Sequence, residues 1–88
     1  MISSTQYNLD KIENMLSDLG YKLRYEKGNF KTGACVFQNT KIIVVNKFSN
    51  LEIKINALVQ LLKDFEVHEE DLDEKQWSFY KTLTKENS

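Results

Sequence analysis

The segment Lys41-Ile42-Ile43-Val44-Val45-Asn46 decides the fold, because its four central residues are all apolar and β-branched, which favours a strand. Successive side chains of a strand point to opposite faces, so Ile43 and Val45 share one face and their apolar neighbours share the other. A strand that is apolar on both faces is typical of a sheet that is covered on both sides. We expect helices on one face, and either the C-terminal helix or a second copy of the protein on the other.

Two earlier runs complete the expected sheet. Tyr21–Glu26 alternates strictly between apolar and charged residues, which is the pattern of a half-buried strand. Ala34–Gln38 is the next β-rich run, and the polar pair Asn39-Thr40 separates it from the third strand, as in a hairpin. We therefore predict a three-stranded antiparallel sheet.

Helical periodicity flanks the sheet on both sides. The first helix has apolar residues at steps of three or four, with Asn8 as its expected N-cap and Gly20 just past its end. Its apolar positions are Leu9, Ile12, Leu16 and Leu19. Ser49 and Glu52 have the spacing of a capping box at the start of a second helix.

The C-terminal part predicts one more helix. Asp71 and Glu74 repeat the capping-box spacing, and the helix should continue to about Lys85. The fold class is thus α+β, in the order helix, three-stranded antiparallel sheet, helix, helix (α-β-β-β-α-α). All 88 residues fit one domain, residues 1–88.

Composition narrows the class of protein. The chain is 41% hydrophobic and 28% charged, and it has no apolar run near the roughly 20 residues that a membrane helix needs. The first residues show no basic stretch followed by an apolar block, so we expect no signal peptide, no membrane partner and a cytoplasmic location. The single cysteine, Cys35, excludes an internal disulfide framework.

Charge is unevenly distributed along the chain. Residues 20–54 carry seven basic and two acidic residues, whereas residues 63–88 carry four basic and eight acidic residues. Basic residues interleaved with aromatic ones on the sheet half are typical of single-strand nucleic-acid binding. That alternative would use Lys22, Arg24, Lys27 and Lys31, although a pI near 5.8 opposes it.

Candidates for catalysis are few. His68 is the only histidine, and Leu72 stands four residues later where a zinc-binding helix would carry a second imidazole. Cys35 lies in a predicted strand, where a free cysteine usually behaves as a small apolar residue. An unrecognised hydrolase that uses Cys35 or His68 remains a third alternative. We expect no catalytic residue, no metal and no cofactor.

Two resemblances carry little function with them. Residues 24–48, with Arg24–Phe30, Gly33, Cys35 and Val45–Phe48, resemble a family of short uncharacterised bacterial proteins. The order helix, three strands, helix (α-β-β-β-α) is also similar to that of double-stranded-RNA-binding domains. Those domains have a lysine cluster at the start of their second helix, where Asn50–Lys54 has one lysine.

A weaker resemblance joins the strand ending in Val45-Asn46 and the following helix to the minimal zinc peptidases of the ImmA/IrrE group. That family carries a His-Glu-x-x-His motif on the helix. Val59, Gln60 and Lys63 stand here where the family has its two histidines and its glutamate. The resemblance therefore implies a degenerate peptidase-like scaffold without its metal.

Together these patterns predict a non-enzymatic protein that acts through protein contacts, as a homodimer or with another protein. The C-terminal helix offers Trp77 and Tyr80, because tryptophan and tyrosine are common interface anchors. The doubly apolar strand adds Ile43 and Val45 as candidate partner-binding residues.

Overall fold

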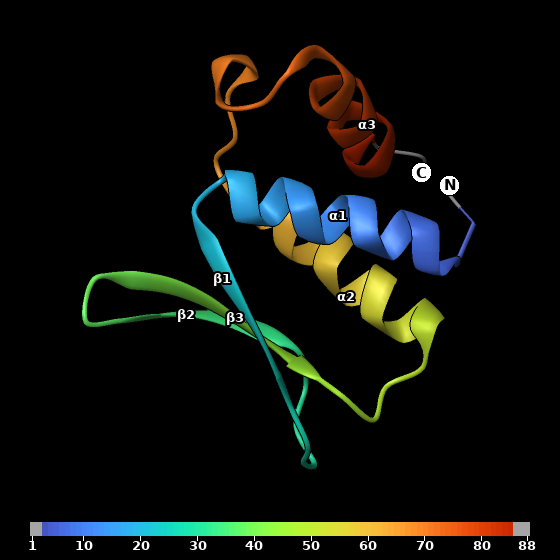
Figure 1. Cartoon of the computed structure of the whole chain (residues 1–88), viewed down its shortest axis with the longest axis vertical. Helices are drawn as coiled ribbons and strands as arrows, with labels where there is room; N and C mark the ends of the chain where they lie inside the picture. Colours follow the sequence, from blue (N-terminus) through green and yellow to red (C-terminus); the bar gives the residue numbers. More distant parts are fainter. Residues whose placement is uncertain (1–2, 86–88) are drawn as a thin grey trace.

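The computed structural model describes residues 3–85 and has the predicted order of elements, helix, three strands and two helices (Figure 1). A single 3₁₀ turn, Glu69–Asp71, precedes the last helix. The elements are α1 (Gln6–Asp18), β1 (Tyr21–Glu26), β2 (Gly33–Phe37), β3 (Thr40–Asn46), α2 (Leu51–Asp64) and α3 (Glu74–Thr84). No helix within residues 3–85 is both long enough and apolar enough to cross a membrane.

The sheet is mixed, so the prediction of an antiparallel sheet was wrong for one of its two strand pairs. Its order is β1-β3-β2, with β3 antiparallel to β2 and parallel to β1. The loop after β1 carries the chain past the place of β3, and the hairpin then returns β3 between the other two strands. β3 is the central strand, and it buries apolar side chains on both faces, Ile43 and Val45 toward the helices and Ile42 on the other side.

The turns and caps explain where the elements begin and end. The hairpin turns at Gln38 and Asn39, both with positive φ, as in a type I′ turn. Gly20, with φ +96°, follows α1 as predicted, since glycine tolerates that backbone conformation. The predicted N-caps were wrong by one to three residues. The observed caps are Thr5 for α1, Asn50 for α2 and Asp73 for α3, each accepting a hydrogen bond from a first-turn N–H.

The core lies between the helices and one face of the sheet. Ile43 and Val45 of β3 are fully buried there, together with Leu58 of α2. Tyr21 of β1 stacks on Phe65 beyond the end of α2, with ring centroids 4.4 Å apart. The same register places all odd-numbered residues of β1 and β3 on this helix-facing side.

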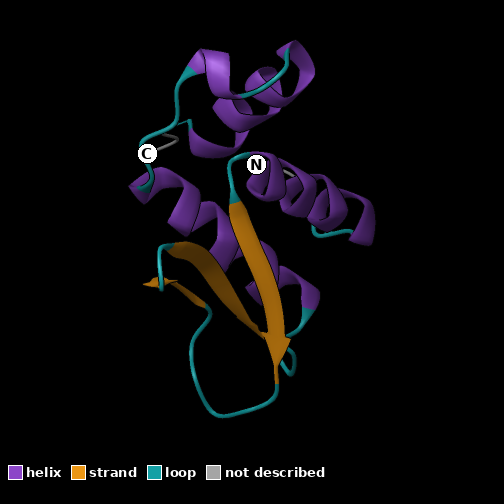
Figure 2. Ribbon diagram, turned by 60° about the vertical axis from the view of Figure 1, so that its left-hand side comes forward, coloured by secondary structure: helices purple, strands orange, loops and turns teal. Residues whose placement is uncertain are grey.

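All three helices lie on one side of the sheet, and no helix of the described chain covers its other side (Figure 2). α3 packs on the other helices and does not cover the sheet. Gln76 of α3 donates a hydrogen bond to Asp18 of α1 at 2.7 Å, and the ammonium of Lys11 lies 4.1 Å from the ring centroid of Phe79. Of the two covers expected for the second face, the C-terminal helix is therefore excluded.

Candidate functional site

The outer edge of β2 is the least protected backbone in the sheet. β2 pairs with β3 along one edge only, so the N–H and C=O groups of its other edge have no strand partner within residues 3–85. Ala34, Cys35, Val36 and Phe37 are all exposed, and Val36 and Phe37 show 71% and 62% of their surface. The turn end of the hairpin extends past the helices (Figure 1). Such an edge is a template for another strand.

Charge distinguishes the two edges of the sheet. Residues 32–40, which include all of β2, carry no charged side chain. β1 forms the opposite edge and carries Lys22, Arg24 and Glu26. Charged residues on an edge strand discourage pairing with a second sheet. β1 is thus a protected edge and β2 an unprotected one.

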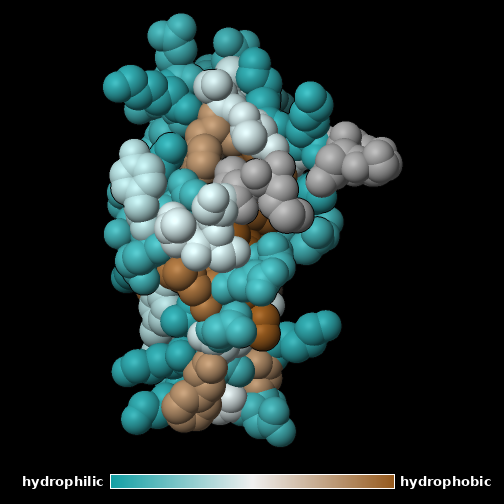
Figure 3. Space-filling model, turned by 90° about the vertical axis from the view of Figure 1, so that its right-hand side faces the viewer, coloured by the Kyte–Doolittle hydropathy of each residue, from teal (hydrophilic) through white to brown (hydrophobic). Residues whose placement is uncertain are grey.

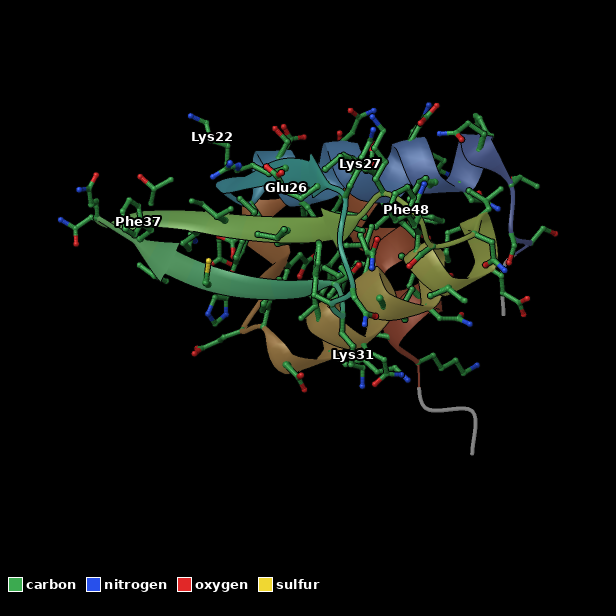
Figure 4. The ribbon with its side chains drawn as sticks, turned by 90° about the horizontal axis from the view of Figure 1, so that it is seen from below. Lys22, Glu26, Lys27, Lys31, Phe37 and Phe48 are labelled. Carbon is green, nitrogen blue, oxygen red and sulfur yellow. The ribbon has the colours of Figure 1, made fainter. Side chains whose placement is uncertain are left out.

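The side of the sheet away from the helices is here called the open face. Its centre is apolar, and cations lie along its border. Ile42 and Val44 form the apolar centre. Ile42 is only 8% exposed because it lies between the side chains of the two neighbouring strands. Lys22 and Arg24 stand beside them on β1, and Phe37 lies near the hairpin end (Figure 4). Glu26, the only acidic residue on these strands, binds Arg24 at 2.9 Å.

One buried polar side chain closes the end of the open face. Asn46, 9% exposed, donates through Nδ2 to the carbonyls of Gly28 and Phe30, at 3.0 and 2.6 Å. Its Oδ1 accepts from the backbone N–H of Phe48 at 2.9 Å, and its own N–H donates to the hydroxyl of Thr32. These bonds hold the β1–β2 loop across the end of β3 (Figure 4). The loop carries Lys27 and Lys31, both exposed.

The four predicted partner-binding residues do not form one surface. Ile43 and Val45 are fully buried beneath the helices, so no partner reaches them in the folded chain. Trp77 and Tyr80 are half-buried on α3, stacked with centroids 5.3 Å apart, and they pack against the core. Both pairs therefore contribute mainly to the interior of the single chain, because β3 is the central strand and α3 folds back onto its own helices.

The two hydrolase candidates are not joined by any hydrogen bond between described residues. Cys35 is exposed on β2, on the open face of the sheet. His68 instead lies within 3.1 Å of the Glu66 carboxylate, and both side chains are exposed. No group of three His, Cys, Asp or Glu side chains with the geometry of a metal site occurs in the described part of the chain.

Shallow hollows lie on the helical side of the molecule; a hollow of about 240 Å³ lies between α1 and α3, and two others border β1. One, of about 220 Å³, lies beside Tyr21, but Lys41 there already donates to the carbonyl of Leu19 and covers the Tyr21 ring. The other, of about 470 Å³, runs between α1 and β1 and includes Glu13. Burial raises the pKa of the Glu13 carboxyl, the charge of Asp10 adds to this, and Lys54 opposes it. Among residues 3–85, neither of these two hollows gathers several cations or hydrogen-bond donors around one point.

Apolar side chains are also exposed away from the sheet, but they are scattered. Phe48 and Ile53 are more than half exposed near the start of α2. On the side of the molecule shown in Figure 3, apolar residues form small patches that hydrophilic residues interrupt. Single exposed apolar residues are common on protein surfaces and need no partner.

The comparisons with known proteins give no family for this chain. No family model, no curated protein and no solved structure matches it.

Sequence reasoning missed Val36 and Phe37, the most exposed apolar residues of the sheet. A signal for them was present, since residues 32–40 form the longest uncharged interval within the basic half of the chain. An uncharged β-rich segment that lies on the sheet edge is unprotected. The strand order was needed to recognise it, because an antiparallel meander would have placed this segment at the centre.

Proposed function

We propose that this protein is a non-enzymatic contact module that forms a homodimer by pairing the β2 strands of two copies edge to edge. The observation that carries the proposal is the exposed, uncharged outer edge of β2. A two-fold axis perpendicular to the sheet would make the pair antiparallel and join the two sheets into one of six strands. Pairing would give the unpaired backbone groups of β2 partners and would abolish its free edge.

The side chains of β2 are complementary to a second copy of themselves. In the register that overlaps Gly33–Phe37 fully, Phe37 faces Gly33 of the other strand, Val36 faces Ala34, and Cys35 faces its own equivalent. Each large side chain thus meets a small one. An aromatic ring across from an edge glycine is a favourable cross-strand arrangement. This self-complementarity supports a second copy as the occupant of the edge.

Electrostatics favours the same edge for self-pairing. Two β1 strands would bring Lys22 and Arg24 of both copies together, and like charges across a strand pair are destabilising. Two β2 strands bring no charged side chain of their own to the interface. Of the two sheet edges, β2 is therefore the one that a second copy can occupy without repulsion.

Sedimentation equilibrium of the full chain tests the proposal. We expect the mass to rise from that of the 10.3 kDa monomer to twice that value as the concentration increases through the micromolar range. Association that buries apolar surface should also persist at high salt, because screening does not weaken it. A single monomer mass at high micromolar concentration would rule out the dimer.

A further inference from the structure

The open face of the sheet is positively charged, and the proposed pairing of β2 strands does not explain this charge. Lys22 and Arg24 border it on β1, and Lys27 and Lys31 stand on the loop that closes its end (Figure 4). Only Glu26 offsets them among the side chains of the open face and its closing loop, and its carboxylate already binds Arg24. The acidic residues of the C-terminal half lie mainly in residues 64–74, outside the sheet.

We infer that the open face binds the phosphates of single-stranded nucleic acid. The part of this inference that involves two copies rests on the proposed dimer. The four cations of each copy supply phosphate contacts, and charge complementarity selects a polyanion. Phe37, 62% exposed on the same face near the hairpin end, offers a ring on which a base can stack. A flat face with cations and an aromatic ring suits an extended strand, whereas an acidic peptide has no planar bases to use the ring.

The proposed dimer would enlarge this surface. In the antiparallel pair, Cys35 of each copy faces the other on the same side, so the two open faces become one continuous face. Eight cations would then border a single six-stranded sheet. A strand of nucleic acid that crosses the two-fold axis would contact both copies, which raises affinity without any new type of contact.

The order in the β1–β2 loop supports a preformed site. Asn46 fixes the carbonyls of Gly28 and Phe30, which lie between Lys27 and Lys31 in the chain. The backbone that carries both lysines is thereby held in place before any ligand binds. Preorganisation reduces the entropy that a ligand must remove on binding.

Fluorescence anisotropy with a labelled single-stranded DNA or RNA of about 20 nucleotides tests the inference, in about 50 mM salt and at rising salt. We expect binding that weakens steeply with salt. The double variant Lys27→Glu/Lys31→Glu should reduce affinity at least about tenfold. The slope of log affinity against log salt concentration should also become shallower, by about 0.7 for each phosphate that is no longer neutralised. Lys75→Glu/Lys81→Glu on α3, two exposed sites with the same total charge change, should leave binding within a factor of about two.

Several results would overturn the inference. These are no binding at low salt, binding that the double variant leaves unchanged, and full competition by polyglutamate, which would assign the face to an acidic polypeptide. Sedimentation of the same samples separates the two proposals. A dimer that does not bind removes only the nucleic-acid inference, whereas a monomer that binds through these lysines removes the dimer and retains the open face as the binding surface.

Discussion

Replacing Val36 by lysine should raise the dissociation constant of the dimer about 100-fold, so that the variant is a monomer where the wild type is dimeric. Each copy loses about 1.5 kcal/mol of apolar burial at the interface, and symmetry doubles this to about 3 kcal/mol. About 1.4 kcal/mol corresponds to a tenfold change in affinity. Val36 is 71% exposed in the single chain, so the monomer itself should stay folded.

A matched control separates the edge from a general effect of charge. Tyr7 is 70% exposed on α1, at the end of that helix away from the hairpin (Figure 1). Tyr7→Lys adds the same charge and should leave the sedimentation behaviour unchanged. If Val36→Lys still dimerises like the wild type, or if both variants dissociate equally, β2 is not the interface.

Replacing Asn46 by alanine should lower the free energy of unfolding by about 2–4 kcal/mol, the largest effect expected of any polar side chain here. The change removes the side-chain hydrogen-bond partner of three backbone groups, the carbonyls of Gly28 and Phe30 and the N–H of Phe48. An unsatisfied buried polar group costs about 1–3 kcal/mol. Thermal unfolding of both proteins at one fixed concentration measures this loss of stability, and we expect Tm to fall by roughly 8–20 °C.

Two variants make the result on Asn46 specific. Asn46→Asp keeps the acceptor for Phe48 but puts carboxylate oxygen against two carbonyls, so it should destabilise at least as much as alanine. Asn14→Ala on the exposed surface of α1 should change stability by less than about 0.5 kcal/mol. An Asn46→Ala protein as stable as the wild type would show that these bonds do not hold the loop.

The elements of this fold could be predicted because their signals are local. Strand β1 matches its predicted bounds because its alternation is strict, and the helix stripes follow from residues a few positions apart. The helix caps were misplaced because more than one residue able to cap a helix stands near each start, Thr5 and Asn8 for α1 and Ser49 and Asn50 for α2.

The strand order and the site could not be predicted in the same way, because both depend on contacts between distant residues. The parallel pairing of β1 with β3 places Leu23 beside Ile43, far along the chain, and no local pattern specifies it. The sequence identified Lys41–Asn46 as a strand that is apolar on both faces. That pattern marks the central strand of the sheet rather than a docking surface. That reversal moved the candidate contact from Ile43 and Val45 to Val36 and Phe37 on the edge strand.

The most direct test of edge pairing is an NMR experiment on a one-to-one mixture of isotope-labelled and unlabelled protein, which detects only contacts between copies. We predict intermolecular contacts between Ala34 of one copy and Val36 of the other, and between Gly33 and Phe37, because these pairs face each other in the proposed register. Contacts confined to another surface, such as α3, would contradict β2 pairing. The absence of any intermolecular contact at high concentration would contradict the dimer itself.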